Sequence, residues 1–342
     1  MTEDLKKRVA VVGATGAVGR VMLQVLEERD FPIESIRLFA SARSAGKEIC
    51  FRGQMLKVET IDGSRSFENV DFALFSAGGV TSRELAPIAR NAGAIVIDNS
   101  NAWRMDPDVP LVVPEVNSQH LLKHSGIIAN PNCSTIQLVV VLNVLESLAP
   151  IRRVVVSTYQ SVSGTGLDAI DELQNQIKAA IEGSEAPAPR VYPHPIAFNL
   201  LPEIDVFDDE GNSMEEMKMV RETRKIMDRP DLMVSATCVR VPVRVGHGES
   251  VNVEFERAVD AVAAREALAA HPSIIVEDDP RNHVYPLPTR TQGLDPVFVG
   301  RIRKDVSHAK GLNMWIVADN LRKGAATNAI QIAEKLMEVN IR

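Results

Sequence analysis

The residues with the clearest chemical potential form the run Asn130-Pro131-Asn132-Cys133-Ser134-Thr135, which precedes an apolar stretch over residues 136–142. Pro131 fixes its own φ angle and disfavours helix at the residue before it, whereas the polar residues around Cys133 are good helix-capping types. The pattern predicts a turn that delivers Cys133 to the first turn of a buried helix. The positive end of a helix favours the thiolate, so Cys133 is a candidate nucleophile for a carbonyl carbon. A buried structural cysteine is the alternative, and it is the commoner role.

A thiolate that forms a thioester also needs a proton-transfer group and groups that orient the substrate. His247 lies between two glycines in a segment where a strand ends, so we expect it in a loop that a ligand can approach closely. An imidazole in that setting favours acid/base chemistry. Arg240 precedes it on the strand and can grip a carboxylate through two hydrogen bonds. Gln160, near the end of another strand, either binds the substrate or is an ordinary strand residue.

Three charged residues leave more than one interpretation open. Glu215 and Lys218 are three residues apart on one face of a predicted helix, and on this spacing alone they indicate a surface ion pair. Arg104 follows a predicted strand that ends at Asp98. The carboxyl ends of strands are where open α/β sheets bind ligands, so Arg104 either holds an anion there or is simply exposed.

A glycine-rich loop, Gly13-Ala14-Thr15-Gly16-Ala17-Val18-Gly19, lies between a short apolar strand and a helical pattern. In this position glycines let the backbone approach a pyrophosphate at the start of the helix. The spacing is GxxGxxG rather than GxGxxG, so the position after the first strand carries the interpretation. A dinucleotide site is therefore favoured over a tight strand-to-helix turn with no ligand.

The end of the second strand indicates which dinucleotide is bound. An Asp or Glu usually binds the ribose 2′-hydroxyl of NAD at this place. Residues 39–47 contain no acid and offer Ser41, Arg43, Ser44 and Lys47 instead. The segment predicts a 2′-phosphate and hence NADP, and a solvated basic loop is the alternative. Ser163-Gly164, beyond the long strand that carries Gln160, can line the nicotinamide.

Two different patterns of elements must position these residues. Up to about residue 149, short apolar strands alternate with helices: strands over 8–12, 35–40, 71–76, 94–98 and 126–129, with helices after Gly19 and over 81–91. This rhythm predicts a doubly wound parallel sheet. Beyond that point the strands are longer, at 151–163, 233–245, 250–256, 297–304 and 313–318. We expect 233–245 to pair with 250–256 and 297–304 to pair with 313–318, which is typical of an antiparallel sheet.

Helices over 168–181, 214–227 and 261–270 are expected to cover that second sheet, and the proline-rich segment 183–195 is expected to lack regular structure. A last amphipathic helix, 324–339, is expected to pack back on the first domain, because an isolated helix of that length is marginal. The prediction is a Rossmann-like parallel-sheet domain, 1–132 with 324–342. An α+β domain with a largely antiparallel sheet, 133–323, follows it.

Composition excludes several classes of protein. The chain has 342 residues, a net charge of −7 and only 4% aromatic residues, which argues against a nucleic-acid surface. Its apolar runs are shorter than the roughly 18 residues of a membrane helix, and the acidic start Met1-Thr2-Glu3-Asp4 argues against a signal peptide. Three widely spaced cysteines suit a reducing cytoplasm better than a disulfide framework. No spacing of Cys and His residues indicates a metal site.

Taken together, these motifs resemble the aspartate-semialdehyde dehydrogenase family over essentially the whole chain. The glycine loop, the segment around Cys133, Ser161-Val-Ser-Gly-Thr-Gly166 and Arg240-Val-Pro-Val all match. Four more segments match as well: Glu215-Glu-Met-Lys218, Gly246-His-Gly-Glu-Ser250, Val299-Gly-Arg-Ile-Arg303 and Asp319-Asn-Leu-Arg-Lys-Gly-Ala-Ala326. The combination is specific, although no single motif is.

The resemblance implies a role for each matching position. Cys133 would be the nucleophile, His247 the acid/base group and Gln160 the residue that orients the substrate. Arg240 would bind the substrate carboxylate and Glu215 its amino end, while phosphate would be bound by Arg104, Asn132 and Lys218. NADP would be held by Gly13, Thr15, Gly16, Ala17, Val18, Ser41, Arg43, Ser44, Ser163, Gly164 and Asn320. The second domain would also form a homodimer.

The implied reaction is the NADPH-dependent conversion of L-aspartyl-4-phosphate to L-aspartate 4-semialdehyde. It serves lysine and diaminopimelate, threonine, methionine and isoleucine biosynthesis. Two alternatives remain: an enzyme of the N-acetyl-glutamyl-phosphate reductase type, and a catalytically silent NADP-binding regulatory protein. A cysteine hydrolase is a weaker option, because it gives the glycine loop no role.

Overall fold

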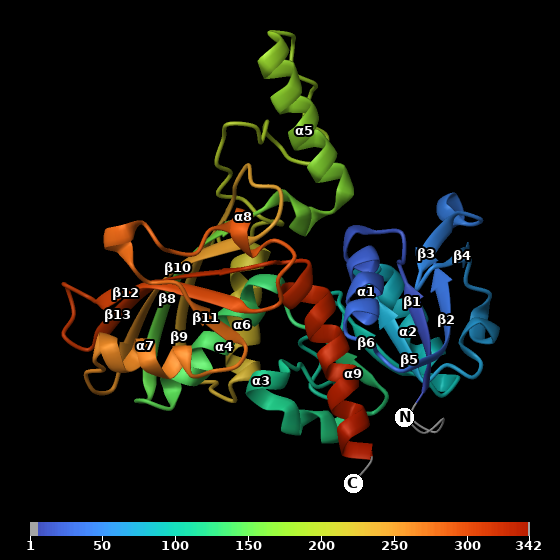
Figure 1. Ribbon diagram of the computed structural model, residues 1–342, viewed down its shortest axis with the longest axis horizontal. Helices are drawn as coiled ribbons and strands as arrows, with labels where there is room; N and C mark the ends of the chain where they lie inside the picture. The colour runs from blue at the N-terminus through green and yellow to red at the C-terminus, as the bar shows by residue number, and fades with distance from the viewer. Residues whose placement is uncertain (1–5, 341–342) are drawn as a thin grey trace. The chain divides into compact units, whose positions relative to one another are not determined.

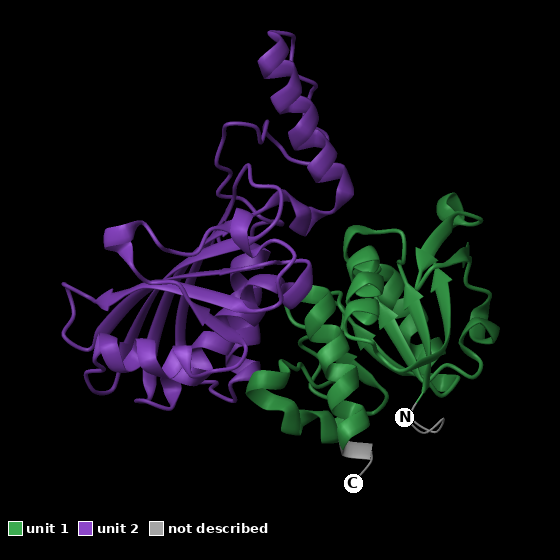
Figure 2. Cartoon of the chain, viewed as in Figure 1, with its two compact units in different colours: residues 1–132, 325–342 green, residues 133–324 purple. Residues whose placement is uncertain are grey.

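The computed structural model describes residues 6–340, and the chain divides into two compact units (Figure 2). Unit 1 extends to Asn132 and resumes at Ala325, and unit 2 spans Cys133–Gly324. The acidic segment Met1–Asp4, on which the expectation about a signal peptide depends, lies outside the described residues. Within residues 6–340, no helix combines the length and the hydropathy that crossing a bilayer requires.

Unit 1 is built on a seven-stranded sheet in the order β3-β4-β2-β1-β5-β6-β7 (Figure 1). Its parallel strands are β1 (Lys7–Val12), β2 (Ile33–Phe39), β5 (Phe72–Phe75), β6 (Ile95–Asp98) and β7 (Ile127–Ala129). These are the short apolar runs of the sequence, and the central ones are buried on both faces, as parallel strands normally are. The predicted parallel sheet is confirmed.

The sequence patterns missed one hairpin in this unit. Strands β3 (Glu48–Phe51) and β4 (Gln54–Glu59) pair antiparallel, and β4 adds to β2 at the edge of the sheet. Most of their side chains are exposed or half-buried, so the apolar pattern that reveals a buried strand is absent here. The hairpin directly follows the basic segment 39–47.

The helices of unit 1 include α1 (Ala17–Glu28), α2 (Gly79–Asn91), α3 (Pro114–Asn117) and α9 (Thr327–Asn340). The buried face of α9 packs into the same apolar core as β1 and α1, through Ala329, Ile330, Ala333 and Leu336. The expectation that the last helix returns to the first domain is therefore confirmed, although α9 begins three residues later than predicted, after a π-helical turn at Arg322–Ala326.

Unit 2 contains a six-stranded sheet in the order β11-β12-β13-β10-β8-β9. Its strands are β8 (Ile151–Gln160), β9 (Met233–Arg240), β10 (His247–Phe255), β11 (Ile274–Val276), β12 (Val297–Lys304) and β13 (Gly311–Ala318). The pairs β8–β10, β10–β13 and β12–β13 are antiparallel, whereas β8–β9 and β11–β12 are parallel. A largely antiparallel sheet is confirmed.

One predicted pairing is wrong. The segments expected at 233–245 and 250–256 do not pair with each other, because β9 lies parallel to β8 on the outer side and β10 lies antiparallel to β8 on the inner side. The long strand 151–163 also ends earlier, at Gln160, and a 3₁₀ turn over Val162–Thr165 follows it. The predicted pair 297–304 and 313–318 is found as β12 and β13.

Helices α4 (Cys133–Glu146), α6 (Met214–Ile226) and α7 (Ala261–Ala269) cover one face of this sheet (Figure 1). Helix α4 begins at Cys133, as predicted, and is buried nearly all round. Helix α5 (Leu167–Glu182) extends away from the sheet, and the segment 183–195 after it has no regular structure, which was also predicted.

Candidate functional site

Three polar side chains lie together where three neighbouring strands of the unit 2 sheet end or begin. The parallel strands β8 and β9 end at Gln160 and Arg240, which are partners in register, and the antiparallel strand β10 begins there with His247. All three are almost completely buried, at 1%, 5% and 0% exposure respectively. The topology therefore brings together three of the residues that the sequence singled out.

Cys133 belongs to the same unit, at the first residue of α4, and its side chain is half-buried. One turn further along α4, Gln137 donates from Nε2 to the main-chain oxygen of His247 over 3.3 Å. A Cβ atom at Gly324 would lie 2.9 Å from the Cβ of Cys133, so only glycine leaves room for the thiol there. The thiol thus lies at a helix start, on a helix that is bonded to the strand carrying the histidine.

His247 is the first residue of β10, and its expected placement in a loop is wrong. Its Nδ1 accepts a hydrogen bond from the main-chain N–H of Ser161 at 3.0 Å. A main-chain N–H can only donate, so the neutral ring carries its proton on Nε2. Nε2 is buried and has no hydrogen-bond partner among the described residues, and a Cβ at Gly164 would lie 3.3 Å from it.

Burial disfavours the charged form of His247, and the nearby Arg240 cation adds to the effect. Together they lower the pKa of His247 to about 3. The imidazole is therefore neutral near pH 7 and presents an N–H donor at Nε2. A second proton can add only at Nδ1, which would make His247 a buried cation beside Arg240, and both effects oppose that. The acid/base role of His247 stays a prediction.

The Gln160 side chain is held from both ends. Its Oε1 accepts from Thr158 Oγ1 at 3.0 Å, and its Nε2 donates to Glu215 Oε1 at 3.0 Å. The carboxylate can only accept and Gln160 Oε1 can only accept, so these two partners fix which way the amide points. Thr158, two residues earlier on the same face of β8, was not identified from the sequence, although the period of two along a strand would have pointed to it.

Glu215 and Lys218 form the predicted ion pair, at 3.1 Å, but the pair does not lie at the surface. Glu215 is only 5% exposed, because its helix packs on β9. Lys218 also donates to Asp205 at 2.8 Å. Burial opposes the Lys218 charge, but Glu215 and Asp205 outweigh it and raise the pKa of Lys218 above its ordinary value. The sequence analysis did not identify Asp205, because only the tertiary fold brings its loop to α6.

Arg240 is a buried cation that is only partly bonded. Its Nη1 donates to the Ser161 main-chain oxygen at 2.8 Å, and its guanidinium carbon lies 5.9 Å from the centre of the Tyr192 ring. Its Nε is buried without a hydrogen-bond partner within the described ranges. A buried donor left unbonded is costly, so this arginine suits an anionic ligand such as a carboxylate.

Asn320 joins the segments that carry these groups. Its Oδ1 accepts from the Gly246 N–H at 2.8 Å and from Ser161 Oγ at 3.1 Å, and its Nδ2 donates to Ser163 Oγ at 2.9 Å. The cofactor role predicted for Ser163, Gly164 and Asn320 stays a prediction. The bonds show that Asn320 holds the turn after β8 against the residue that precedes His247.

The glycine loop of unit 1 is shaped by close backbone approaches. Gly13 has a φ of +87° and an added Cβ would lie 2.4 Å from the oxygen of Ser76, while a Cβ at Gly19 would lie 2.2 Å from the oxygen of Gly13. Thr15 Oγ1 donates to Ser44 Oγ at 3.3 Å. The glycine loop and the basic segment with exposed Ser41 and Arg43 therefore lie together, as a site for an NADP 2′-phosphate requires.

Arg104 and Asn132 are buried in unit 1, at 8% and 6% exposure, so the exposed alternative for Arg104 is wrong. Arg104 donates from Nε to the Asn130 oxygen at 3.0 Å and from Nη2 to the Asn99 oxygen at 2.9 Å. These bonds tie the loop after β6 to the turn before Cys133. The phosphate-binding role of both residues stays a prediction.

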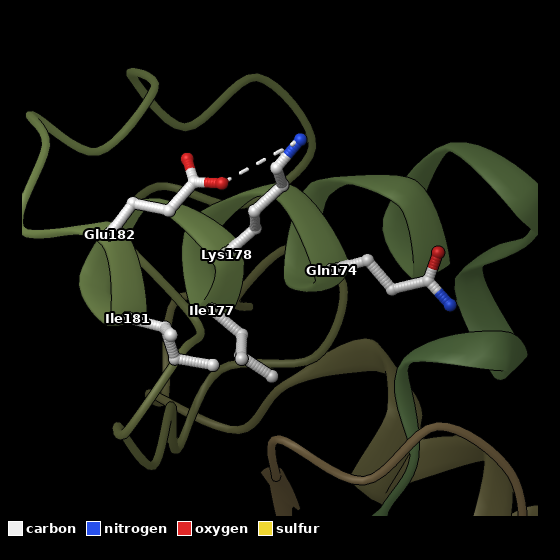
Figure 3. A pocket seen from close by; sticks show the side chains of 5 residues that line it. All are labelled: Gln174, Ile177, Lys178, Ile181 and Glu182. Atoms are coloured by element: carbon white, nitrogen blue, oxygen red, sulfur yellow. Dashed lines mark ion pairs between the residues drawn. The ribbon is translucent and has the colours of Figure 1, made fainter.

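A hollow of about 280 Å³ along α5 is lined by Gln174, Ile177, Lys178, Ile181 and Glu182 (Figure 3). Its side chains all come from one helix, and none of the sequence-predicted residues lines it. The candidate site is therefore defined by the converging side chains and not by this hollow. Among residues 6–340, no group of three or more His, Cys, Asp or Glu side chains could hold a metal ion.

The chain is similar to known proteins over nearly its whole length. Residues 8–124 match the model "Semialdehyde dehydrogenase, NAD binding domain", and residues 142–323 match "Semialdehyde dehydrogenase, dimerisation domain". The aspartate-semialdehyde dehydrogenase of Aquifex aeolicus is 57% identical over 97% of this chain and 98% of its own length.

Solved structures of aspartate-semialdehyde dehydrogenases have the same fold as this chain. The aspartate-semialdehyde dehydrogenase II of Vibrio cholerae complexed with ASA has a TM-score of 0.93 and 47% identity, and covers 97% of this chain and 98% of its own. The Candida albicans enzyme with NADP has a TM-score of 0.77 and 26% identity, over 98% of this chain and all of its own.

The tautomer of His247 can be checked directly. We expect ¹⁵N NMR of histidine-labelled protein, assigned with a His247→Gln variant, to show Nδ1 unprotonated and Nε2 protonated from pH 8 down to pH 5. The folded pKa of His247, about 3, lies below the unfolded value near 6.5. The free energy of unfolding should therefore decrease as the pH is lowered from 6.5, by up to about 1.4 kcal/mol per pH unit. A ring that titrates near pH 6.5 in the folded protein would contradict this.

Proposed function

The chain belongs to the aspartate-semialdehyde dehydrogenase family, and on that premise we propose that Cys133 carries its reaction through a thioester. It is an NADP-dependent, phosphorylating aldehyde dehydrogenase that interconverts L-aspartyl-4-phosphate and L-aspartate 4-semialdehyde. The observation that supports the thioester route is the half-buried thiol at the start of α4, in one unit with Gln160, Arg240 and His247. The reductase and silent-regulator alternatives are not favoured by relatives of this similarity.

The substrate has a carboxylate, an ammonium group and an acyl phosphate, and we assign a partner to each. Arg240 binds the carboxylate, since its Nε is a buried donor without a partner in the described part of the chain. Glu215 binds the ammonium group, and Lys218 on the same helix binds the phosphate. The phosphate contacts of Arg104 and Asn132 remain predictions from the family resemblance.

The bond changes follow from these positions. The Cys133 thiolate attacks the acyl carbon, a carbon–sulfur bond forms, the carbon–oxygen bond to phosphate breaks, and inorganic phosphate leaves. NADPH, when bound, supplies the hydride that reduces the thioester carbon. The carbon–sulfur bond then breaks, which releases the semialdehyde and restores the thiolate. In both tetrahedral stages negative charge builds on the acyl oxygen, and the N–H at His247 Nε2 can stabilise it.

The cofactor assignment rests on unit 1. Gly13, Gly16 and Gly19 allow a close backbone approach at the start of α1, and no acid follows β2, so an NADP 2′-phosphate fits better than a free ribose hydroxyl. We assign it to Ser41, Arg43 and Ser44. A cytoplasmic location is also part of the proposal, since the chain has three free cysteines and its products feed amino-acid biosynthesis.

The central test is the phosphate-dependent oxidation of aspartate semialdehyde, followed by NADPH absorbance. We expect Cys133→Ser to lower turnover by at least about 10³-fold while NADP still binds, because an alcohol is a far weaker nucleophile at neutral pH. Cys50→Ser, at an exposed cysteine, is the matched control and should retain full activity. Substantial turnover by Cys133→Ser would remove the thioester from the proposal.

Cofactor selectivity is expected to depend on Arg43. Arg43→Ala should raise KM for NADPH by roughly 10-fold or more and leave KM for NADH unchanged, because only NADPH has the 2′-phosphate. Arg65→Ala, which removes another exposed arginine of the same unit, should change neither value. A wild-type preference for NADH would overturn the assignment.

The chain acts as a homodimer through the domain at residues 142–323. We place the contact on the open face of the unit 2 sheet, opposite α4, α6 and α7, where Ser157, Tyr159, Ser250 and Trp315 lie side by side. The Tyr159 and Trp315 rings are 5.5 Å apart there, and Gly248 leaves space for the indole. An aromatic pair on the face opposite these three helices is a suitable centre for an interface.

Ser250→Arg tests this face, because Ser250 is exposed at its middle, in register with Ser157 and Trp315. We expect analytical ultracentrifugation to show mostly monomer for the variant, since a buried unpaired charge is costly at an interface. Ser64→Arg, at an exposed serine of unit 1, should remain dimeric. A dimeric Ser250→Arg protein would place the interface elsewhere.

A further inference from the structure

Glu249 is a buried carboxyl group for which the reaction as described has no use. It lies two residues after His247 on β10, so both side chains point to the face of the sheet that the helices cover. Its neighbours in register are Thr158 on β8 and Ile316 on β13. Helix α4 packs against strand β10, which carries Glu249. Its exposure is 0%.

The hydrogen bonds around Gln137 leave three buried oxygens without donors. Gln137 Nε2 donates to the His247 main-chain oxygen. That carbonyl can only accept, so the amide cannot flip to exchange its oxygen and nitrogen. Its Oε1 then needs a donor, and the described residues provide none in hydrogen-bond geometry. Both carboxyl oxygens of Glu249 are in the same situation. The Gln137 and Glu249 side chains interact with each other. Two acceptors that both lack a donor can satisfy each other only if one of them carries a proton.

The carboxyl is the group that can carry it. Burial disfavours the Glu249 carboxylate and raises the pKa of this side chain well above its ordinary value, and the Gln137 side chain opposes that effect only in part. No charged group of the described chain contributes to the shift, and Thr158, Ile316 and Gln137 are uncharged. A neutral acid is both a donor and an acceptor, so it removes the shortage without a buried charge.

We propose that Glu249 is a protonated positioning residue, whose O–H donates to Gln137 Oε1 and so fixes the amide that bonds α4 to the His247 main chain. Gln137 is one helical turn from Cys133, so this bond sets the spacing between the thiol and the imidazole. The inference rests on the proposed function for its catalytic consequence, but the protonation of Glu249 and the reactivity of the thiol can be measured without it.

The test compares two substitutions at Glu249. Glu249→Gln keeps the shape and a donor without a charge, so kcat and both KM values should stay within about 3-fold of wild type. Glu249→Leu removes the donor, and kcat should fall roughly 10- to 100-fold with KM nearly unchanged, because a displacement of about 1 Å costs that much in a positioned reaction. Glu266→Gln, an isosteric change at an exposed position of α7, is the control.

Two further measurements decide the proposal even if Glu249→Leu folds poorly. Infrared difference spectra of wild type minus Glu249→Gln at pH 7.5 should contain the C=O band of a protonated carboxylic acid. Iodoacetamide should alkylate Cys133 at a near-wild-type rate in Glu249→Gln and at an altered rate in Gln137→Leu, measured in a Cys50→Ser background. These readouts hold even if aspartate semialdehyde is not the substrate.

Three results would overturn the inference. Loss of kcat in Glu249→Gln equal to that in Glu249→Leu would mean that the charge itself is required. A carboxylate band in place of the acid band would mean that Glu249 is ionised. A folded Glu249→Leu protein with lower thermal stability but unchanged kcat would reduce Glu249 to a packing residue.

Discussion

The main chain of Ser161 holds the reactive side chains of unit 2 in place. Its N–H donates to His247 and its oxygen accepts from Arg240, so one residue fixes the proton position of the imidazole and the direction of the guanidinium. Main-chain groups do not change rotamer or charge, which makes them firm supports for a site. The position of Ser161 depends in turn on where β8 ends and on Asn320, which accepts from its hydroxyl. The geometry of the site therefore depends on how strands β8, β9 and β10 align.

Close backbone approach is the second constraint, and glycines provide it. Gly164 lies against both Arg240 and His247, and Gly324 lies against Cys133. A methyl group at Gly324 would collide with the Cys133 side chain, and one at Gly164 would force the buried Arg240 and His247 side chains to shift. The glycines around His247 were expected to admit a ligand. Gly248 instead makes room for Trp315 on the other face of the sheet, so one glycine of that pair serves the packing of the sheet.

How far the sequence could predict the site depends on the range of the interactions involved. Cys133 at the start of α4 follows from a few adjacent residues, and the prediction is confirmed. The pairing of β9 and β10 depends on contacts far apart along the chain. Local alternation of apolar residues does not contain that information, and the predicted pairing of these two strands was wrong. Asp205 could not be identified for the same reason, and neither could the bonds that the Ser161 main chain makes to His247 and Arg240. Thr158 and Glu249 lie two residues from Gln160 and His247, so a search along the strand at a period of two would have found both.

Lys218 and two carboxylates are paired with one another before any ligand binds. Lys218 lies between Glu215 and Asp205, and Glu215 also accepts from Gln160. A substrate ammonium group at Glu215 would compete with Lys218 for the same carboxylate, and Lys218 would then have a donor to direct elsewhere. A phosphate oxygen is the natural acceptor for that donor, because it replaces the lost negative charge. Binding of the amino end and of the phosphate end are coupled in this way through one carboxylate, and the same carboxylate keeps the Gln160 amide aligned.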